Sequence, residues 1–187
     1  MGNRGCLHDA QGRIRRQYIG RRWIICLLEF KGRHRAVMSP GHYTELFFLD
    51  EASALAAGHR PCAECQRARF DLFRESWAQA NPALAGTTRP SAVSLDAQLH
   101  HERLGPVVDA DRTCRSLETL PGGTFITPDD RLAYLVLDGE LLLWAPGGYT
   151  PQDVREFRFR ARVLTPLSVV RTLSAGYPVD IHPSAVQ

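Results

Sequence analysis

The sequence contains almost no lysine: among its 23 basic residues, only Lys31 is not an arginine. It also has no apolar run near the ~20 residues that a membrane-spanning helix needs, and no apolar stretch of the signal-peptide type at its start. These absences predict a cytoplasmic protein with no membrane partner. With 44% hydrophobic and 23% charged residues, the 187-residue chain is also unlike a disordered, collagenous or coiled-coil protein.

A disulfide framework is not expected, because five cysteines are an odd number in a chain without an export signal. Cys62 and Cys65 form a Cys-Ala-Glu-Cys motif directly before a helix predicted at 66–79. Two intervening residues place both sulfurs within reach of one zinc ion. The same spacing at a helix N-terminus also suits thiol redox chemistry. A zinc half-site, a redox pair and two buried apolar thiols are therefore the alternatives.

The hydrophobic periodicity predicts an α+β fold. A small N-terminal sheet with a cysteine knuckle and helices should precede a small antiparallel sheet or barrel with one helix. The predicted strands are 13–15, 23–30, 36–38, 46–49, 124–126, 132–137, 140–144 and 156–164. The predicted helices are 51–57, 66–79, 91–104 and 166–175. Asp50 is a favourable N-cap and Gly58 a favourable end for the first helix, and Asp138-Gly139 predicts a tight hairpin turn.

These elements divide the chain into three predicted segments. Residues 1–80 form a zinc-binding region, residues 81–121 a linker with a helix, and residues 122–187 a β-rich C-terminal region.

Residues 46–67 contain an aromatic pair, Phe47-Phe48, then an alanine-rich helix ending at Gly58, and then Arg60-Pro61 before the two cysteines. This stretch resembles the second half of the metal-binding domain at the N-terminus of Ada-type DNA-repair methyltransferases. The resemblance implies that the cysteine pair is half of a zinc site, on a scaffold that lies against DNA. The rest of the chain looks like a bacterial protein family that implies no mechanism.

The chain departs from the Ada pattern upstream of the cysteine pair. The family takes its other two ligands from that region, and one of them is the cysteine that accepts the methyl group. At the corresponding place this sequence offers only His34, in a basic turn. Phosphotriester repair is therefore not expected. The Pro-Cys-His-Arg motif of the alkyltransferase domain and a helix-turn-helix are absent as well.

The remaining zinc ligands must come from other cysteines and histidines. Cys6 and His8 are two residues apart, so an extended chain points both side chains to one side. We therefore predict a Zn²⁺ site made of four residues, Cys6, His8, Cys62 and Cys65. The alternative ligands are Cys26, His34, His42 and His59.

Basic charge is concentrated in residues 1–45, which carry a net charge of +6 in a chain whose total is +3. A surface that faces phosphate requires such a concentration, and guanidinium pairs with phosphate in a bidentate fork. A biased genome composition is the competing explanation for the arginines. We predict contact with DNA or RNA through Arg13, Arg15, Arg16, Arg21, Arg22, Arg33 and Arg35.

Two patterns leave an enzyme as an alternative. Residues 7–15 resemble the hairpin of HNH-type endonucleases, in which His8 would activate water, although the metal-binding helix of that family has no counterpart. Asp96 and His100 share one face of helix 91–104, as acid/base or metal-binding residues do, and as ordinary surface residues also do. The alternatives to a nucleic-acid-associated zinc protein are therefore a metal-dependent nuclease or other hydrolase, and a thiol redox or interaction module.

Overall fold

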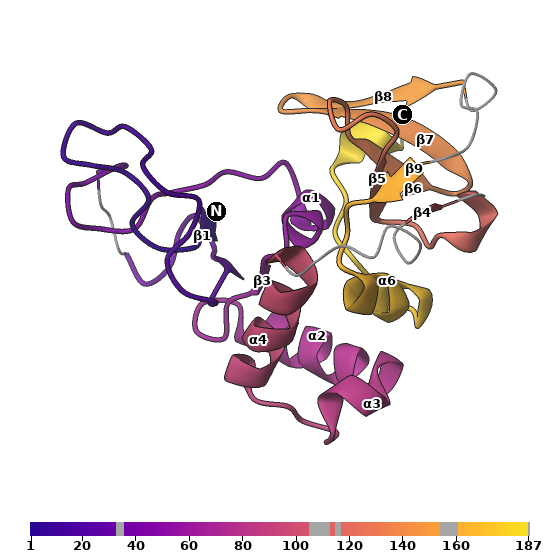
Figure 1. The fold of residues 1–187 in the computed structure, drawn as a ribbon, viewed down its shortest axis with the longest axis horizontal. Helices are drawn as coiled ribbons and strands as arrows, with labels where there is room; N and C mark the ends of the chain where they lie inside the picture. The colour runs from indigo at the N-terminus through magenta and orange to yellow at the C-terminus, as the bar shows by residue number, and fades with distance from the viewer. Residues whose placement is uncertain (33–35, 105–112, 115–116, 154–160, 187) are drawn as a thin grey trace.

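The computed structural model describes residues 1–32, 36–104, 113–114, 117–153 and 161–186. It confirms the predicted α+β class, with one three-stranded and one six-stranded sheet. Figure 1 shows the N-terminal part and the six-stranded sheet at opposite sides of the molecule, with the helices between and below them. Within the described ranges, no helix is both long enough and apolar enough to span a membrane.

The N-terminal sheet is much smaller than predicted. Its strands pair in the order β1-β2-β3, antiparallel and then parallel, and are β1 (Gly2–Asn3), β2 (Ile24–Ile25) and β3 (Arg60–Pro61). The long strand predicted at 23–30 is wrong beyond β2, and 36–38 is a turn. Leu27 and Leu28 are exposed, so the apolar run does not cover a sheet face. The strands predicted at 13–15 and 46–49 are reduced to single bridges, Ile14 with His8 and Leu46 with Gly2.

The predicted helices are confirmed, with small shifts at their ends. They are α1 (Glu51–Ala56), α2 (Arg67–Ala80), α4 (Ala92–Leu104) and α6 (Leu167–Ser174). Asp50 caps α1, accepting from the backbone N–H of Ser53 at 2.8 Å. Gly58 follows α1 with φ +74°, and a Cβ there would collide with the Arg103 guanidinium. Sequence patterning missed a short helix in the linker, α3 (Pro82–Ala85), which begins on a proline.

The C-terminal sheet is antiparallel, with strand order β4-β9-β5-β6-β7-β8. The strands are β4 (Thr113–Cys114), β5 (Thr124–Thr127), β6 (Tyr134–Leu137), β7 (Glu140–Ala145), β8 (Gly148–Gln152) and β9 (Ala161–Val163). Asp138 and Gly139 both have positive φ, as a two-residue hairpin turn requires. Strand β8 was not predicted, and the strand predicted at 156–164 is described only from residue 161. The described residues also include two short 3₁₀ helices, Leu117–Thr119 and Pro183–Ala185.

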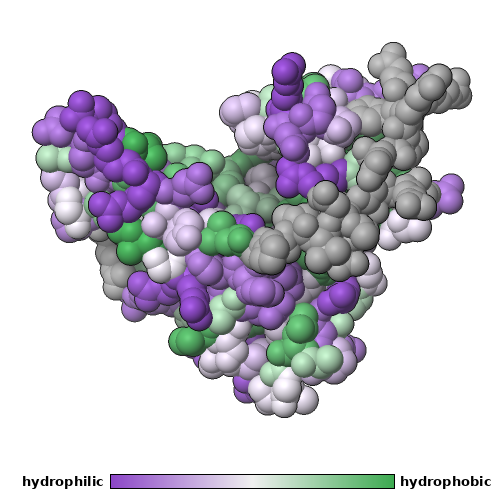
Figure 2. Space-filling view, in the orientation of Figure 1, coloured by the Kyte–Doolittle hydropathy of each residue, from purple (hydrophilic) through white to green (hydrophobic). Residues whose placement is uncertain are grey.

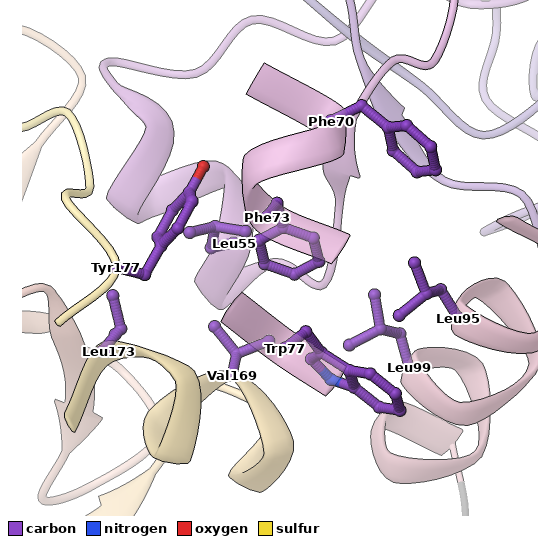
Figure 3. Packing of buried hydrophobic residues seen from close by; sticks show 9 residues of the cluster. All are labelled: Leu55, Phe70, Phe73, Trp77, Leu95, Leu99, Val169, Leu173 and Tyr177. Carbon is purple, nitrogen blue, oxygen red and sulfur yellow. The ribbon is translucent and has the colours of Figure 1, made fainter. Parts of the chain in front are cut away.

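The largest apolar cluster joins all three predicted segments of the chain. In Figure 3, Trp77 of α2 lies between Val169 of α6 and Leu99 of α4. The full cluster is Leu55, Phe70, Phe73, Trp77, Leu95, Leu99, Val169, Leu173 and Tyr177. The packed core therefore does not divide at the predicted segment boundaries.

The first turn of α1 also binds the C-terminal region through hydrogen bonds. The hydroxyl of Tyr149 donates to Asp50 at 2.6 Å, and that of Tyr177 donates to Glu51 at 2.7 Å. Helix α1, which leads to the cysteine motif, is thus held in place by two tyrosines of the C-terminal region.

Candidate metal centre

Three cysteines form a cluster in which all sulfur atoms lie within 4.8 Å of one another: Cys26, Cys62 and Cys65. Cys26 directly follows β2 and Cys62 directly follows β3. Because these strands run parallel, with Ile25 opposite Pro61, the two cysteines leave the sheet at the same edge. The turn that starts at Cys62 then carries Cys65 back toward them.

Backbone hydrogen bonds hold the cysteine turn against β2. The N–H of Cys62 donates to the carbonyl of Ile25 at 2.9 Å. The Gln66 side chain donates to the same carbonyl, also at 2.9 Å. Gln66 precedes α2, so one acceptor in β2 fixes both the start of the turn and the entry to the helix.

Two sulfurs accept backbone hydrogen bonds of the kind that stabilises thiolates. The N–H of Glu64 points to the Cys62 sulfur, and the N–H of Leu27 points to the Cys65 sulfur, both at 3.4 Å. Such bonds favour the charged form of the acceptor. The backbone therefore places two N–H donors where they would stabilise thiolates of Cys62 and Cys65.

The three thiols differ in acidity. A hydrogen bond from the Cys26 thiol lowers the pKa of Cys62 to about 5, and the backbone N–H groups of Cys65 and Glu64 act in the same direction. The pKa of Cys26 is raised, because its proton is held by Cys62 and because burial disfavours its thiolate. Burial also raises the pKa of Cys65. Cys62 is therefore the most acidic of the three thiols.

A cavity of about 940 Å³ lies beside the cysteine cluster. The three cysteines line it together with apolar side chains such as Ile24, Leu27 and Phe30. Its charged lining residues are Arg22, Glu45, Arg60 and Glu64. A solute can therefore approach the cluster from this side.

Cys6 and His8, the other two predicted ligands, lie outside the cluster. The His8 ring is buried, with Nδ1 2.6 Å from the hydroxyl of Thr44 and Nε2 3.3 Å from the carbonyl of Ser39. The Cys6 thiol lies 3.6 Å from the carbonyl of His8 and donates to it. The predicted set of four ligands is therefore not assembled among the described residues, and two of its members join Cys26 instead.

The two alternative histidine ligands that the structure describes, His42 and His59, do not join the cluster either. His59 is buried between Trp23 and Phe48, with ring centroids 5.4 and 4.7 Å away. Burial, with a smaller effect of Arg103, lowers its pKa to about 3. His42 is exposed, and His34 lies outside the described residues.

The arginines predicted to contact nucleic acid are exposed where the structure describes them, and Arg33 and Arg35 lie outside those ranges. Figure 2 shows hydrophilic side chains gathered over the outer loops of the N-terminal part. Arg13 and Arg15 pair with Asp9 at 3.1 and 2.7 Å. The remaining described members are Arg16, Arg21 and Arg22.

The two carboxylates of α4, Asp96 and Glu102, have structural partners. Asp96 pairs with Arg60, and Glu102 accepts from the backbone and the hydroxyl of Ser168 at 3.1 and 3.0 Å. His100 packs edge-on against Tyr18 at 5.1 Å. These contacts give Asp96 and Glu102 structural roles, whereas Nδ1 of His100 is buried without a hydrogen-bond partner among the described residues.

The sequence alone offers Cys26 only as an alternative ligand, because this cysteine lies within an apolar run. Its only local signal is its position directly after two β-branched residues that form a strand. The second signal, pairing with the strand before Cys62, is tertiary. The chain matches no protein-family model, no curated protein and no solved structure.

Proposed function

We propose that this protein binds zinc, with Cys26, Cys62 and Cys65 as thiolate ligands. The mutual distance of the three sulfurs carries the proposal. A tetrahedral zinc ion with Zn–S bonds of ~2.3 Å separates its sulfurs by about 3.8 Å, so a small contraction would place the three sulfurs at three of the four ligand positions. Thiolates are soft ligands that favour zinc over magnesium or calcium.

The zinc ion would join three pieces of backbone: the end of β2, the end of β3 and the turn before α2. The hydrogen bonds to sulfur from Leu27 and Glu64 fit this role, since they complement the charge of bound thiolates. Strands this short have little stability of their own. The metal therefore stabilises the N-terminal sheet.

The two enzyme-like alternatives have weaker support. A redox pair needs only Cys62 and Cys65, and leaves the close approach of Cys26 without a role. A nuclease centred on His8 needs a free ring nitrogen to activate water, whereas both nitrogens of His8 have partners at hydrogen-bond distance.

We further propose that the protein associates with DNA or RNA through its N-terminal arginines. The exposure of Arg16, Arg21 and Arg22 without an acidic partner among the described residues supports this. So does the resemblance of residues 46–67 to a domain that lies on DNA. Methyl transfer is no part of the proposal.

Elemental mass spectrometry of the purified protein tests the zinc site. We expect about one zinc per chain, lost or strongly reduced in Cys26→Ser and Cys62→Ser. Cys6→Ser is the matched control, because Cys6 is a free, half-buried cysteine of the same region outside the cluster. Folded protein without metal, or a Cys26→Ser variant with full zinc content, would overturn the proposal. A Cys62–Cys65 disulfide in that protein would favour the redox alternative.

A further inference from the structure

We propose that Arg4, Arg15 and Arg16 form a pocket that binds a phosphate group. They line a cavity of about 410 Å³, whose other walls are Leu7, Ile14, Gln17 and Leu46, with no acidic side chain among these described residues. The inference rests on the proposed nucleic-acid contact for two of the arginines. It adds Arg4, which the charge pattern did not single out.

Arg4 is the innermost cation of the pocket and has no anionic partner in the described part of the chain. Its guanidinium carbon lies 4.6 Å from the ring centroid of Trp23, and its Nε is buried without a hydrogen-bond partner. A buried donor without an acceptor is costly, and more so when it is charged. The Arg4 charge would attract an anion in the cavity that it lines, although its Nε is itself closed off from solvent.

A second guanidinium packs on the same indole ring. Arg103 lies 3.5 Å from the Trp23 centroid, and its Nε and Nη1 are also buried without partners. Burial, together with the nearby charge of Arg4, lowers the pKa of Arg103 to about 9, while the carboxylates of Asp96 and Glu102 act in the opposite direction. Two cations that disfavour each other's charge inside a protein create a positive potential, which attracts an anion.

The other groups packed against Trp23 supply no negative charge. They are the rings of His59, His100 and Tyr18, and both nitrogens of His59 lack partners. Arg15 donates from Nε to Asp9, a carboxylate that also accepts from Nε of Arg13 and from the backbone N–H groups of Gln11 and Arg13. The terminal nitrogens of Arg15 therefore stay available to a ligand.

The shape of the pocket matches a phosphate attached to an apolar or planar group. Guanidinium groups bind phosphate oxygens in pairs, and Ile14, which is 59% exposed, offers an apolar surface beside them. A nucleotide has both parts. The phosphate could belong to a free mononucleotide or to a nucleic-acid strand, two sources that share this chemistry.

Isothermal titration calorimetry of the full chain with adenosine 5′-monophosphate and with inorganic phosphate tests the pocket. We expect Arg4→Gln and Arg16→Gln each to weaken binding roughly tenfold or more, the usual effect of losing one charge-assisted hydrogen bond. Arg131→Gln is the control, since Arg131 is an exposed arginine that neither lines the pocket nor belongs to the N-terminal arginines. Its affinity should equal that of the wild type.

The pocket is excluded if the wild type binds neither probe, or if Arg16→Gln binds as tightly as the wild type. Arg16 is fully on the surface, so this variant stays informative even if Arg4→Gln disturbs the packing of Trp23. Short single-stranded DNA with a 5′-phosphate or a 5′-hydroxyl distinguishes the sources. Preference for the phosphorylated end keeps the pocket and assigns it to chain ends. Binding of the mononucleotide without any DNA binding keeps the pocket and removes the proposed nucleic-acid contact.

Discussion

Arg60 donates from Nε and Nη2 to the two carboxylate oxygens of Asp96, with both distances 2.9 Å, in the interior of the protein. Arg60 is two residues before Cys62 in β3, and Asp96 lies in α4. The guanidinium also stacks on Phe70 of α2 at 4.9 Å. This ion pair therefore fixes the cysteine turn to two helices at once.

Removing one partner of this pair should destabilise the fold strongly. Asp96→Ala leaves the Arg60 charge buried and unpaired, and the expected loss in the free energy of unfolding is about 3–5 kcal/mol. Urea unfolding followed by circular dichroism measures it. Arg67→Ala is the control, because the Arg67–Asp71 pair is exposed and should contribute about 0–1 kcal/mol. Equal losses in the two variants would show that the buried pair has no special role.

Removing the metal should loosen the N-terminal sheet before the C-terminal sheet. No cysteine of the cluster belongs to the apolar cores formed by the helices and by strands β5, β6 and β7. We expect a zinc chelator to speed amide hydrogen exchange around β2, β3 and the cysteine turn, while β5–β7 keep their protection. Exchange read by mass spectrometry at peptide resolution is the measurement. Simultaneous loss of protection in β5–β7 would mean that the metal stabilises the whole fold as one unit.

Acid should destabilise the protein through His59. Its pKa is about 3 in the folded protein, against an ordinary value of 6.5, so the unfolded chain takes up the proton first. The free energy of unfolding must then fall as the pH drops below about 6.5, by about 2 kcal/mol at pH 5. His59→Phe should remove this part of the pH dependence. The measurement is denaturant unfolding of both proteins between neutral pH and pH 5. An equal fall in the free energy of unfolding with pH in the two proteins would contradict the prediction.

Nucleic-acid binding, if it uses the N-terminal arginines, must depend on salt. Each phosphate contact on duplex DNA contributes about 0.9 to the slope of log K against log salt concentration. Replacing Arg15, Arg16, Arg21 and Arg22 by alanine should lower both affinity and slope in fluorescence anisotropy titrations. Arg67→Ala and Arg131→Ala, which change exposed arginines elsewhere, should change neither. Absence of binding at low salt to every DNA and RNA probe would remove the proposal.

Local signals in the sequence predicted the parts of the fold that local contacts determine. The cap at Asp50 and the turn at Asp138-Gly139 depend on residues within a few positions of each other, so α1 and the β6–β7 hairpin were predictable. Strand β8 was not predictable, because it contains Gly148 and Pro151, residue types that are depleted in strands. It exists through pairing with β7, which no short window of sequence contains.

The candidate site was half predictable for the same reason. The spacing of Cys62 and Cys65 is enough to predict a pair of ligands, whereas Cys26 joins them only through the parallel pairing of β2 with β3. The run 23–30 looked like one long strand because its residues are apolar. In the fold, only Ile24 and Ile25 form the strand. Leu27, directly after Cys26, donates its backbone N–H to the sulfur of Cys65 instead.

The hydrogen bonds from Tyr149 to Asp50 and from Tyr177 to Glu51 tie the segment before the cysteine motif to the C-terminal region of the chain. Cutting the chain after α2 would strip both carboxylates of these donors and expose Phe73 to water. A detachable zinc module can be recombined with new neighbours during evolution. In this chain the cysteine motif is part of a larger fold, and helix α1 connects it to the C-terminal region.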